Sequence, residues 1–416
     1  MDTVRLDTTL LNPHVATPAL ALDFEVISQT YDRFVSAFRA YNARGVVYYA
    51  MKANATQDVL DLLGRKGAGF EIASLPELYK ALAAGAQGEH IICSNPIKTP
   101  AFLRKMQAAG VYAVVADSID EMYKIADAAP GMRVYVRLAV DNTGSVLPLA
   151  GKFGVDKELA LQLFDLAREL GLHPIGLSFH VGSQCLKPQN WVNAIRACGE
   201  VWREAEARGH HFNFLDIGGG FPAGHYHDAS IPTIEAIADA VMPALNMFIP
   251  VRADLLFVLE PGRGMVGESG RLLATVEGKA IRRTASGDQS WLYLDVGVFN
   301  GLMETYEGFP PVVSVLDVDG RERSLKTYTL AGPSCDSCDV IARDLQLPEV
   351  QIGDRLVFYD TGAYTNEYAA AFNGFPIPEV IVLPETSSTG LTMGDLVVNN
   401  TSHPAEEMQP AETAPA

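Results

Sequence analysis

The chain has 416 residues, of which 48% are hydrophobic, and a formal net charge of −18. This length suits two domains, or one large barrel with an additional module. The acidic balance argues against nucleic-acid binding, which needs clustered lysine and arginine. No apolar stretch is long enough to span a bilayer, and the first residues lack the features of a signal peptide. We therefore expect a cytoplasmic protein that binds neither nucleic acid nor membrane. The five scattered cysteines do not resemble a disulfide framework.

Strand-like runs alternate with helical patterns through the first two thirds of the chain. The eight runs are 46–50, 70–73, 90–93, 112–116, 133–138, 175–181, 214–217 and 255–260. Two helices are predicted to open with a capping box, in which a serine hydroxyl and a glutamate carboxylate bind free backbone N–H groups: Ser74 with Glu77, and Ser118 with Glu121. The alternation predicts a (β/α)₈ barrel, a TIM-like α/β fold of ~250 residues. An open doubly wound sheet is the alternative, and it needs fewer strands.

The segments that flank this pattern differ from it. An apolar segment at 19–22 precedes a helical pattern around Val35, Phe38 and Tyr41. After residue 265, strand-like runs occur with little helix between them, at 271–276, 290–295, 312–316 and 355–359. We predict an N-terminal segment (1–30) that joins the β domain, a cofactor-binding barrel (31–265), a mostly β domain (266–384) and a tail (385–416). The last part of the tail has the composition of a disordered segment.

Polar residues and glycines stand at the ends of most of the predicted barrel strands. In chain order they are Lys52, Glu71, Arg137, His180, Gly218 to Gly220, Glu260 and, just beyond, Arg263. The carboxyl ends of barrel strands meet on one rim, where the active sites of such barrels lie. Each of these residues alone could be a solvated strand end, but their convergence predicts an active site.

Lys52 ends an apolar run that covers residues 46–54. The simplest interpretation is that its amine reaches solvent beyond the strand. The functional interpretation is a desolvated amine with a lowered pKa, which suits the formation of a Schiff base.

The glycine run before Phe221 predicts a phosphate site. Without a Cβ, backbone N–H groups can approach a phosphate closely, and Arg263 can bind two of its oxygens. A dinucleotide is disfavoured because no Gly-x-Gly-x-x-Gly opens a helix after an early strand. Together with Lys52 this site predicts pyridoxal 5′-phosphate. Glu260 against the pyridine nitrogen would keep the ring protonated, which favours loss of CO₂. His180 could lie against the ring or be a hydrogen-bonded barrel histidine.

A second dense stretch, 331–339, contains the pair Cys335 and Cys338. No second pair or nearby histidine completes a zinc site, so we expect no metal. A redox role lacks a thioredoxin-like context. We interpret Cys335 as a proton donor and Asp336 as the acceptor for a substrate ammonium group. The alternative, a turn with two buried thiols, leaves Asp336 unexplained.

Taken together, these motifs resemble a known family, the ornithine/lysine decarboxylases of the alanine-racemase-fold enzymes that use pyridoxal phosphate. The similarity runs in order from about residue 20 to about residue 383. The segments that carry it are 49–54 (YAMKAN), 70–74 (FEIAS), 152–154 (KFG), 178–183 (SFHVGS), 216–222 (DIGGGFP), 260–263 (EPGR), 332–336 (GPSCD) and 362–365 (GAYT).

The resemblance implies a barrel plus a β domain, and a head-to-tail homodimer with shared active sites. It implies that Lys52 holds the cofactor covalently, that Glu260 pairs with the pyridine nitrogen and that His180 stacks on the ring. Glu71, Arg137, Gly219 and Gly262 would also contact the cofactor. The phosphate would be held by Ser183, Gly220, Arg263 and Tyr364. Cys335 and Asp336 would come from the partner subunit, Cys335 to return a proton to the carbon that loses CO₂ and Asp336 to bind the distal ammonium.

The implied reaction is decarboxylation of L-ornithine or L-lysine to putrescine or cadaverine in polyamine biosynthesis. Asp336 favours these substrates, because diaminopimelate decarboxylases typically have glutamate there. Glu71 stands where many relatives have aspartate, and Phe299 where eukaryotic members have tyrosine. A second amine-binding aspartate is missing, and Glu304 or Glu307 would substitute for it. One alternative is another substrate, such as diaminopimelate, carboxynorspermidine or a specialised diamino acid. The other is a non-catalytic regulatory relative, which the complete catalytic set disfavours.

Overall fold

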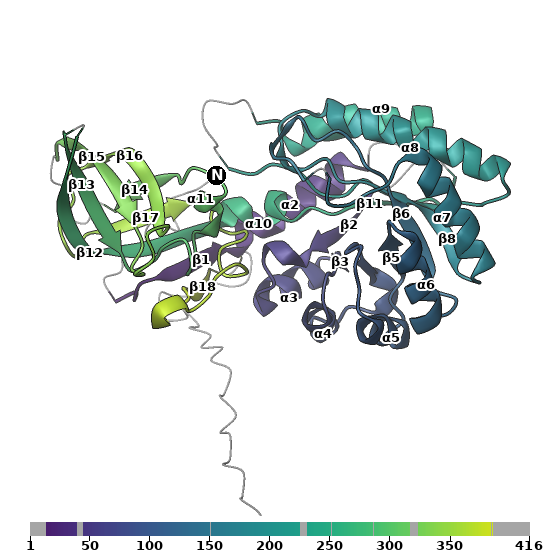
Figure 1. Cartoon of the computed structure of the whole chain (residues 1–416), viewed down its shortest axis with the longest axis horizontal. Helices are drawn as coiled ribbons and strands as arrows, with labels where there is room; N and C mark the ends of the chain where they lie inside the picture. Colours follow the sequence, from purple (N-terminus) through teal and green to yellow (C-terminus); the bar gives the residue numbers. More distant parts are fainter. Residues whose placement is uncertain are drawn as a thin grey trace, which may run out of the picture.

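The computed structural model describes residues 14–39, 45–149, 151–224, 231–250, 252–285, 287–316, 323–383 and 385. Of the predicted tail (385–416) only Glu385 is described, and the last part, with its disordered composition, lies outside the described residues. A barrel with its surrounding helices and a β-rich part lie side by side along the long axis of the molecule (Figure 1). Within the described residues, no helix combines the length and the apolar composition needed to cross a lipid bilayer.

Eight parallel strands close into a barrel in the order β10-β11-β2-β3-β4-β5-β6-β8. They are β2 (Gly45–Ala50), β3 (Gly69–Glu71), β4 (Ile91–Cys93), β5 (Ala113–Ala116), β6 (Arg133–Arg137), β8 (His173–Ser178), β10 (Phe214–Asp216) and β11 (Leu256–Leu259). Each predicted run overlaps one of these strands. The predicted barrel is confirmed, and the open sheet is excluded by the closure between β10 and β8. Side chains such as Tyr48, Tyr135 and Phe214 fill the interior, so the barrel is a packed core.

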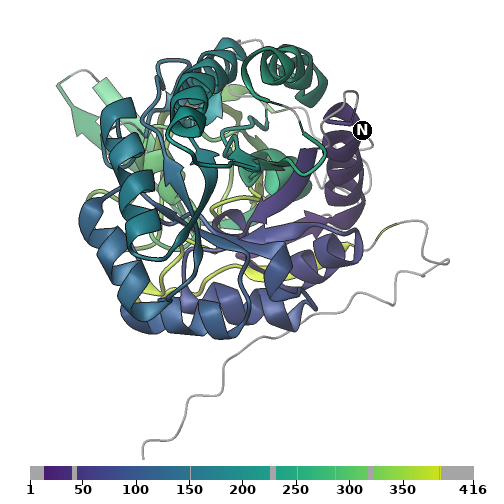
Figure 2. The same cartoon turned by 90° about the vertical axis from the view of Figure 1, so that its right-hand side faces the viewer.

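The barrel helices form a ring around the strands (Figure 2). They are α2 (Phe24–Ala37), α3 (Gln57–Arg65), α4 (Leu75–Ala83), α5 (Pro100–Ala108), α6 (Ile119–Ala128), α7 (Lys157–Glu169), α8 (Gln189–Ala207) and α9 (Ile234–Phe248). The helix predicted around Val35 and Phe38 corresponds to α2, which ends just before Phe38; Tyr41 lies outside the described residues.

The two predicted capping boxes are only half right. Ser74 and Ser118 cap α4 and α6 by accepting the backbone N–H groups of Glu77 and Glu121. The Glu77 carboxylate accepts the N–H of Ala73, one residue before the cap. The Glu121 carboxylate does not close its box, because it binds Lys98 and Lys124 instead. These two ion pairs, one with the distant Lys98 and one within α6, outcompete the local hydrogen bond.

The β-rich part is an eight-stranded sheet in which the order β14-β17-β12-β13-β15-β16 is extended by β1 and β18. Its strands are β1 (Ala19–Asp23), β12 (Gly270–Thr284), β13 (Gly287–Leu294), β14 (Val313–Val315), β15 (Leu325–Ala331), β16 (Val340–Pro348), β17 (Arg355–Tyr359) and β18 (Glu379–Leu383). The N-terminal β1 pairs antiparallel with β12 and parallel with β18. From β1 in this sheet the chain enters the barrel through α2, and after β11 it returns to the sheet with β12.

Short elements between the larger ones position the predicted site. They are η1 (Met51–Ala53), which carries Lys52, and η2 (Gly88–His90); a two-stranded sheet of β7 (Ser145–Leu147) and β9 (Ser183–Cys185); α10 (Arg263–Val266), η3 (Gly267–Ser269), α11 (Met303–Tyr306) and η4 (Phe372–Gly374).

Candidate active site

A hollow of about 550 Å³ lies at the carboxyl ends of the barrel strands. Lys52 enters it from η1, directly after β2. The residues around it come from several strand ends and the loops that follow them: Lys52, Glu71, Ala73, Ser94, Asn95, Pro96, Arg137, Pro148, Leu149, Lys152, Phe153 and His180. The structure therefore brings four of the predicted site residues to one cavity at the predicted rim.

Lys52 forms an ion pair across the cavity wall. Its Nζ lies 2.8 Å from Oε2 of the buried Glu71, at the end of β3. Burial acts to lower the pKa of Lys52, but the carboxylates of Glu71 and Glu260 outweigh it, so the pKa is raised above its ordinary value. The expectation of a lowered pKa is therefore wrong, because it considered desolvation without these two carboxylates.

Glu260 follows β11 and is buried at the end of a chain of polar groups. It accepts a hydrogen bond from the hydroxyl of Ser94, and that hydroxyl lies 2.7 Å from the hydroxyl of Tyr135. The backbone N–H of Ser94 also donates to Oε1 of Glu71, at 3.3 Å. Ser94 thus links the carboxylate beside Lys52 to Glu260.

Asp216, the last residue of β10, is a second buried carboxyl group beside Glu260. Burial raises the pKa of Asp216, and the neighbouring Glu260 raises it further. Burial also raises the pKa of Glu260, with a contribution from Glu71. Oδ1 of Asp216 accepts the N–H of Gly218 at 2.7 Å. Two adjacent buried carboxyl groups do not readily ionise together, and the hydrogen bond between them raises the pKa of Asp216 and lowers that of Glu260, so the shared proton is favoured on Asp216.

His180 is held neutral and in one orientation. The N–H of Gly182 donates to its Nδ1 at 3.0 Å, which leaves Nε2 as the protonated nitrogen. Burial, followed by the charges of Arg137 and Lys52, lowers the pKa of His180 well below its ordinary value. Gly219 packs against this ring, since a Cβ there would lie 3.2 Å from Nε2 and 2.7 Å from the carbonyl oxygen of Glu260.

The residues expected to form a phosphate cup lie together. Arg263 opens α10, and its Nη2 donates to Oγ of Ser183 at 3.4 Å. Its guanidinium carbon lies 4.8 Å from the ring centre of Tyr364, and the N–H of Tyr364 donates to the carbonyl oxygen of Ala53 at 2.7 Å. The cup is therefore tied to the short helix that carries Lys52.

Two glycines make the cup possible. Gly220 has a φ of +89°, and a Cβ there would lie 2.5 Å from the carbonyl oxygen of Gly182. At Gly262 a Cβ would lie 3.0 Å from the Cβ of Ala53. A larger residue at Gly220 would be strained and would force its neighbour to move, whereas at Gly262 the contact with Ala53 would be tight and the neighbour would have to shift by a few tenths of an ångström.

Arg263 has a strong partner that the sequence does not suggest. Its Nη1 donates to Oε2 of Glu304 at 2.7 Å, and its Nη2 donates to Oε1 of the same carboxylate. Glu304, expected as a possible amine-binding acid, therefore binds the cup arginine. Glu307 is exposed at the end of α11.

Cys335 and Asp336 lie away from this cavity in their own chain. They are exposed in the loop between β15 and β16, so the alternative of two buried thiols is wrong. Oδ1 of Asp336 accepts the N–H of Cys338 at 2.9 Å, and hydrogen bonds from Cys338 lower the pKa of Asp336. The Asp336 carboxylate is therefore exposed and readily ionised.

Ser94 and Asp216 were missed as site residues, although the sequence holds a signal for both. Each stands at the carboxyl end of a barrel strand, Ser94 directly after β4 and Asp216 at the end of β10. The rule that identified Lys52 and Glu260 applies equally to them.

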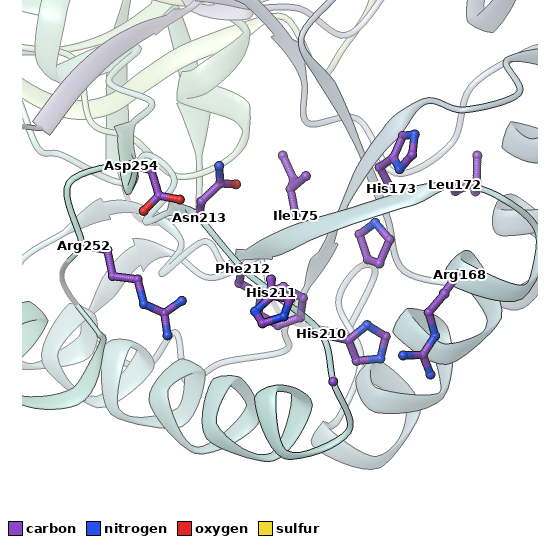
Figure 3. Close-up of a pocket in the computed structure, with 12 residues that line it drawn as sticks. Arg168, Leu172, His173, Ile175, His210, His211, Phe212, Asn213, Arg252 and Asp254 are labelled. Carbon is purple, nitrogen blue, oxygen red and sulfur yellow. The ribbon is translucent and has the colours of Figure 1, made fainter.

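Another hollow, of about 600 Å³, lies at the amino ends of the barrel strands (Figure 3). Histidines and arginines line it, but several are already engaged: Nε2 of His210 lies 2.9 Å from Asp165, and Arg252 donates to Glu206 at 2.6 Å. It contains none of the predicted site residues. The active sites of such barrels lie at the opposite rim, where Lys52 stands.

The residues at the rim fit pyridoxal phosphate. They supply an amine for a covalent bond, a buried carboxylate for the ring nitrogen, a neutral histidine, and a glycine-lined cup with an arginine. Among the described residues no group of three or more His, Cys, Asp and Glu side chains is placed to hold a metal ion.

Comparisons with known proteins identify the family. Residues 25–267 match the family described as pyridoxal-dependent decarboxylase, pyridoxal binding domain. The lysine/ornithine decarboxylase of Selenomonas ruminantium is 34% identical over 378 residues, which cover 90% of this chain and 92% of the relative. Antizyme inhibitor 2 of Xenopus laevis is 34% identical over 79% of this chain and 73% of its own.

A solved structure agrees with these matches over nearly the whole chain. The lysine/ornithine decarboxylase of Vibrio vulnificus, solved with putrescine, superposes with a TM-score of 0.79 at 31% identity, covering 92% of this chain and 98% of that one. The chain therefore belongs to the pyridoxal-dependent ornithine/lysine decarboxylase family, and its cofactor is pyridoxal phosphate.

Proposed function

We propose that this enzyme decarboxylates L-ornithine or L-lysine to putrescine or cadaverine, as a step of polyamine biosynthesis. The observation that carries the proposal is the chain of contacts from Lys52 through Glu71 and Ser94 to Glu260 at the barrel rim. It stands in a family whose members include lysine/ornithine decarboxylases. Pyridoxal phosphate, when bound, supplies the electron sink for the electrons that CO₂ leaves behind.

Residues at the barrel rim, together with Tyr364, would hold that cofactor. Lys52 would bind it covalently, Glu260 would face its ring nitrogen and His180 would lie against its ring. Glu71 and Arg137 would contact it from the cavity wall. The phosphate would be held by Ser183, Gly219, Gly220, Gly262, Arg263 and Tyr364.

Glu71 would accept the proton that the Lys52 amine must lose. The amine must lose its proton before it can act as a nucleophile. Oε2 of Glu71 lies 2.8 Å from Nζ, within direct transfer distance. Asp216, by donating to Glu260, would keep the Glu260 charge fixed in place. Neutral His180 would add no positive charge next to the ring.

The active site would be completed by a second copy of the chain. Cys335 and Asp336 are exposed on the β-rich part, where they can reach the cavity of a partner in a head-to-tail homodimer. Cys335 would return a proton to the carbon that lost CO₂, and Asp336 would bind the distal ammonium of the substrate. A cytoplasmic location remains a prediction from the sequence.

A substrate panel tests the activity. Purified protein with added pyridoxal phosphate is incubated with ornithine, lysine, arginine and diaminopimelate, while released CO₂ and amine are measured. We expect ornithine or lysine to be the preferred substrate. Release from diaminopimelate alone would replace the proposed substrate, and no release from any of the four by a cofactor-loaded protein would refute it.

The covalent role of Lys52 has its own test. Borohydride reduction should fix the cofactor to the native protein but not to Lys52→Ala, with peptide mass spectrometry locating the bond. Fixation on the variant would assign the bond to another lysine, with Lys152 the neighbour to examine, because it lines the same cavity.

A regulatory role is the second candidate, because antizyme inhibitor 2 is among the relatives. It predicts a protein that folds and stays soluble but releases no CO₂ from any substrate of the panel. The presence of both Lys52 and the contact chain to Glu260 favours catalysis instead.

A further inference from the structure

The pair between Arg263 and Glu304 joins the barrel to the β-rich part. Arg263 is the first residue of α10, and Glu304 lies in α11, between β13 and β14. The exposed fractions of their side chains are 5% and 16%. The guanidinium also lies 4.8 Å from the ring centre of Phe309, whose N–H donates to the carbonyl oxygen of Glu304 at 3.0 Å. One segment thus presents both a carboxylate and an aromatic ring to this arginine.

The carboxylate occupies the part of Arg263 that an anion would use. A planar guanidinium binds carboxylate and phosphate in the same way, through two parallel N–H···O bonds. In the structure Nη1 and Nη2 both donate to Glu304. A phosphate that takes these atoms must displace the Glu304 carboxylate or share the arginine with it at close range.

We propose that Glu304 competes with the cofactor phosphate for Arg263, so that it sets cofactor affinity and does not bind the distal ammonium of the substrate. This inference rests on the proposed function, in which Arg263 belongs to the phosphate cup. A buried arginine without an anion beside it is strongly unfavourable. Glu304 therefore stabilises the protein when no phosphate is bound, and its stabilising contribution is reduced when phosphate arrives.

The expected effect on cofactor affinity follows from thermodynamic linkage between phosphate binding and the Arg263–Glu304 pair. Removing the Glu304 charge raises the free energy of the phosphate-free protein more than that of the loaded protein, so the cofactor binds more tightly. The Arg263 side chain keeps its position in Glu304→Gln because the Tyr364 and Phe309 rings and Ser183 still contact it. An amine-binding role makes a different prediction, since loss of that acid raises the KM for the diamino acid and leaves cofactor affinity alone.

The experiment titrates full-length wild type and Glu304→Gln with pyridoxal phosphate and follows bound cofactor by absorbance. We expect Kd for the cofactor to fall roughly three- to tenfold in the variant, as for the loss of one competing charged contact. The melting temperature without cofactor should fall, and its rise on addition of cofactor or inorganic phosphate should be larger than in wild type. The KM for ornithine or lysine should stay within twofold.

Matched variants separate this effect from a general loss of charge. Glu307→Gln removes the same charge from an exposed position of the same segment and should leave the cofactor Kd unchanged. Glu304→Asp keeps the charge but is too short to reach both Nη atoms, so its Kd should lie between wild type and Glu304→Gln; it also serves if the Gln variant does not fold.

An unchanged or weaker cofactor Kd in Glu304→Gln, or a raised KM at unchanged Kd, would overturn the inference. Wild-type protein that binds cofactor and releases CO₂ would still support the proposed function in that case. Wild type that binds no cofactor would instead refute the proposed function itself.

Discussion

Asp216 places a proton next to the carboxylate that would face the cofactor ring. Its Oδ1 accepts the Gly218 N–H, and its carboxyl group shares a hydrogen bond with Glu260. An asparagine can reproduce both bonds, one through its oxygen and one through its NH₂ group. We expect Asp216→Asn to keep the rate of CO₂ release within a few-fold. Asp216→Ala should lose about 1–3 kcal/mol of unfolding free energy, measured in urea, because buried polar groups lose a partner.

Comparing Asp216→Asn with Asp216→Ala separates the effect of the hydrogen bond to Glu260 from the effect of the ionisable proton of Asp216. Both should fold, since the changed side chain is small and sits at the end of β10. If Asn reduced CO₂ release as much as Ala, the titrating proton of Asp216 would matter, and the hydrogen bond to Glu260 would not explain its role.

His180 makes the stability of the protein depend on pH. Its pKa is far below the ordinary value of 6.5 because it is buried and lies near Arg137 and Lys52. The unfolded chain therefore binds a proton below pH 6.5 that the folded protein does not, which favours unfolding. The stabilisation is complete above 6.5 and is lost as the pH falls below it, by up to about 1.4 kcal/mol per pH unit.

Urea unfolding at several pH values between 7.5 and 5 measures this slope. The carboxyl groups of Asp216 and Glu260 act in the opposite direction, because their pKa values are raised in the folded state. The slope of wild type alone is thus a sum, and the difference from His180→Gln gives the histidine term. Equal slopes for the two proteins would show that His180 titrates in the folded state.

At the scale of elements, a buried lysine fixes the loop that carries Ser94. The Nζ of Lys98 donates to the carbonyl oxygens of Asn95 and Val115 and lies 3.0 Å from the Glu121 carboxylate of α6. Replacing Lys98 with Met leaves Glu121 partly uncompensated in the core, so we expect a loss of roughly 3–5 kcal/mol of unfolding free energy. The cofactor should also bind more weakly, because Ser94 loses its anchor.

A double-mutant cycle tests the coupling between Lys98 and Glu121. Lys98→Met with Glu121→Gln should cost less than the sum of the single variants, since neither charge is then left alone. Lys124→Met is the control, because Lys124 contacts the same carboxylate from a partly exposed position and should cost about 1 kcal/mol or less. Additive effects of Lys98 and Glu121 would contradict a direct coupling.

The elements that could be predicted from sequence are those whose pattern is local. The buried barrel strands are continuous apolar runs, and their ends place Lys52, Glu71 and Glu260 on one rim. Strands β15 and β16 were not predicted, because charged side chains interrupt their apolar pattern, as exposed sheet positions allow. Examples are Lys326, Arg343 and Asp344. Pairings such as Lys98 with Glu121, or Arg263 with Glu304, join segments that only folding brings together.

At the scale of the whole molecule, the two groups of predicted catalytic residues lie on different parts of one chain. Lys52 and Glu260 stand at the barrel rim, whereas Cys335 is exposed on the β-rich part. The two parts are joined by the chain itself, which runs from β1 into α2 and from η3 into β12, and by the Arg263–Glu304 pair. In the proposed head-to-tail dimer, the β-rich part of one subunit would reach the barrel of the other, so each complete site would need two chains.

Mixing two inactive variants tests this arrangement. Lys52→Ala retains an intact loop at Cys335, and Cys335→Ala retains an intact barrel, so a dimer of one with the other contains one complete site and one that lacks both residues. If the subunits exchange freely, half of the dimers in an equal mixture are mixed, and we expect about a quarter of wild-type CO₂ release. Each variant alone should release far less.

A mixture no more active than its parts, under conditions where tagged subunits are shown to exchange, would place Cys335 in the site of its own chain. Activity in a species that light scattering shows to be a monomer would contradict the shared site in the same way, because one chain would then supply every residue the reaction needs.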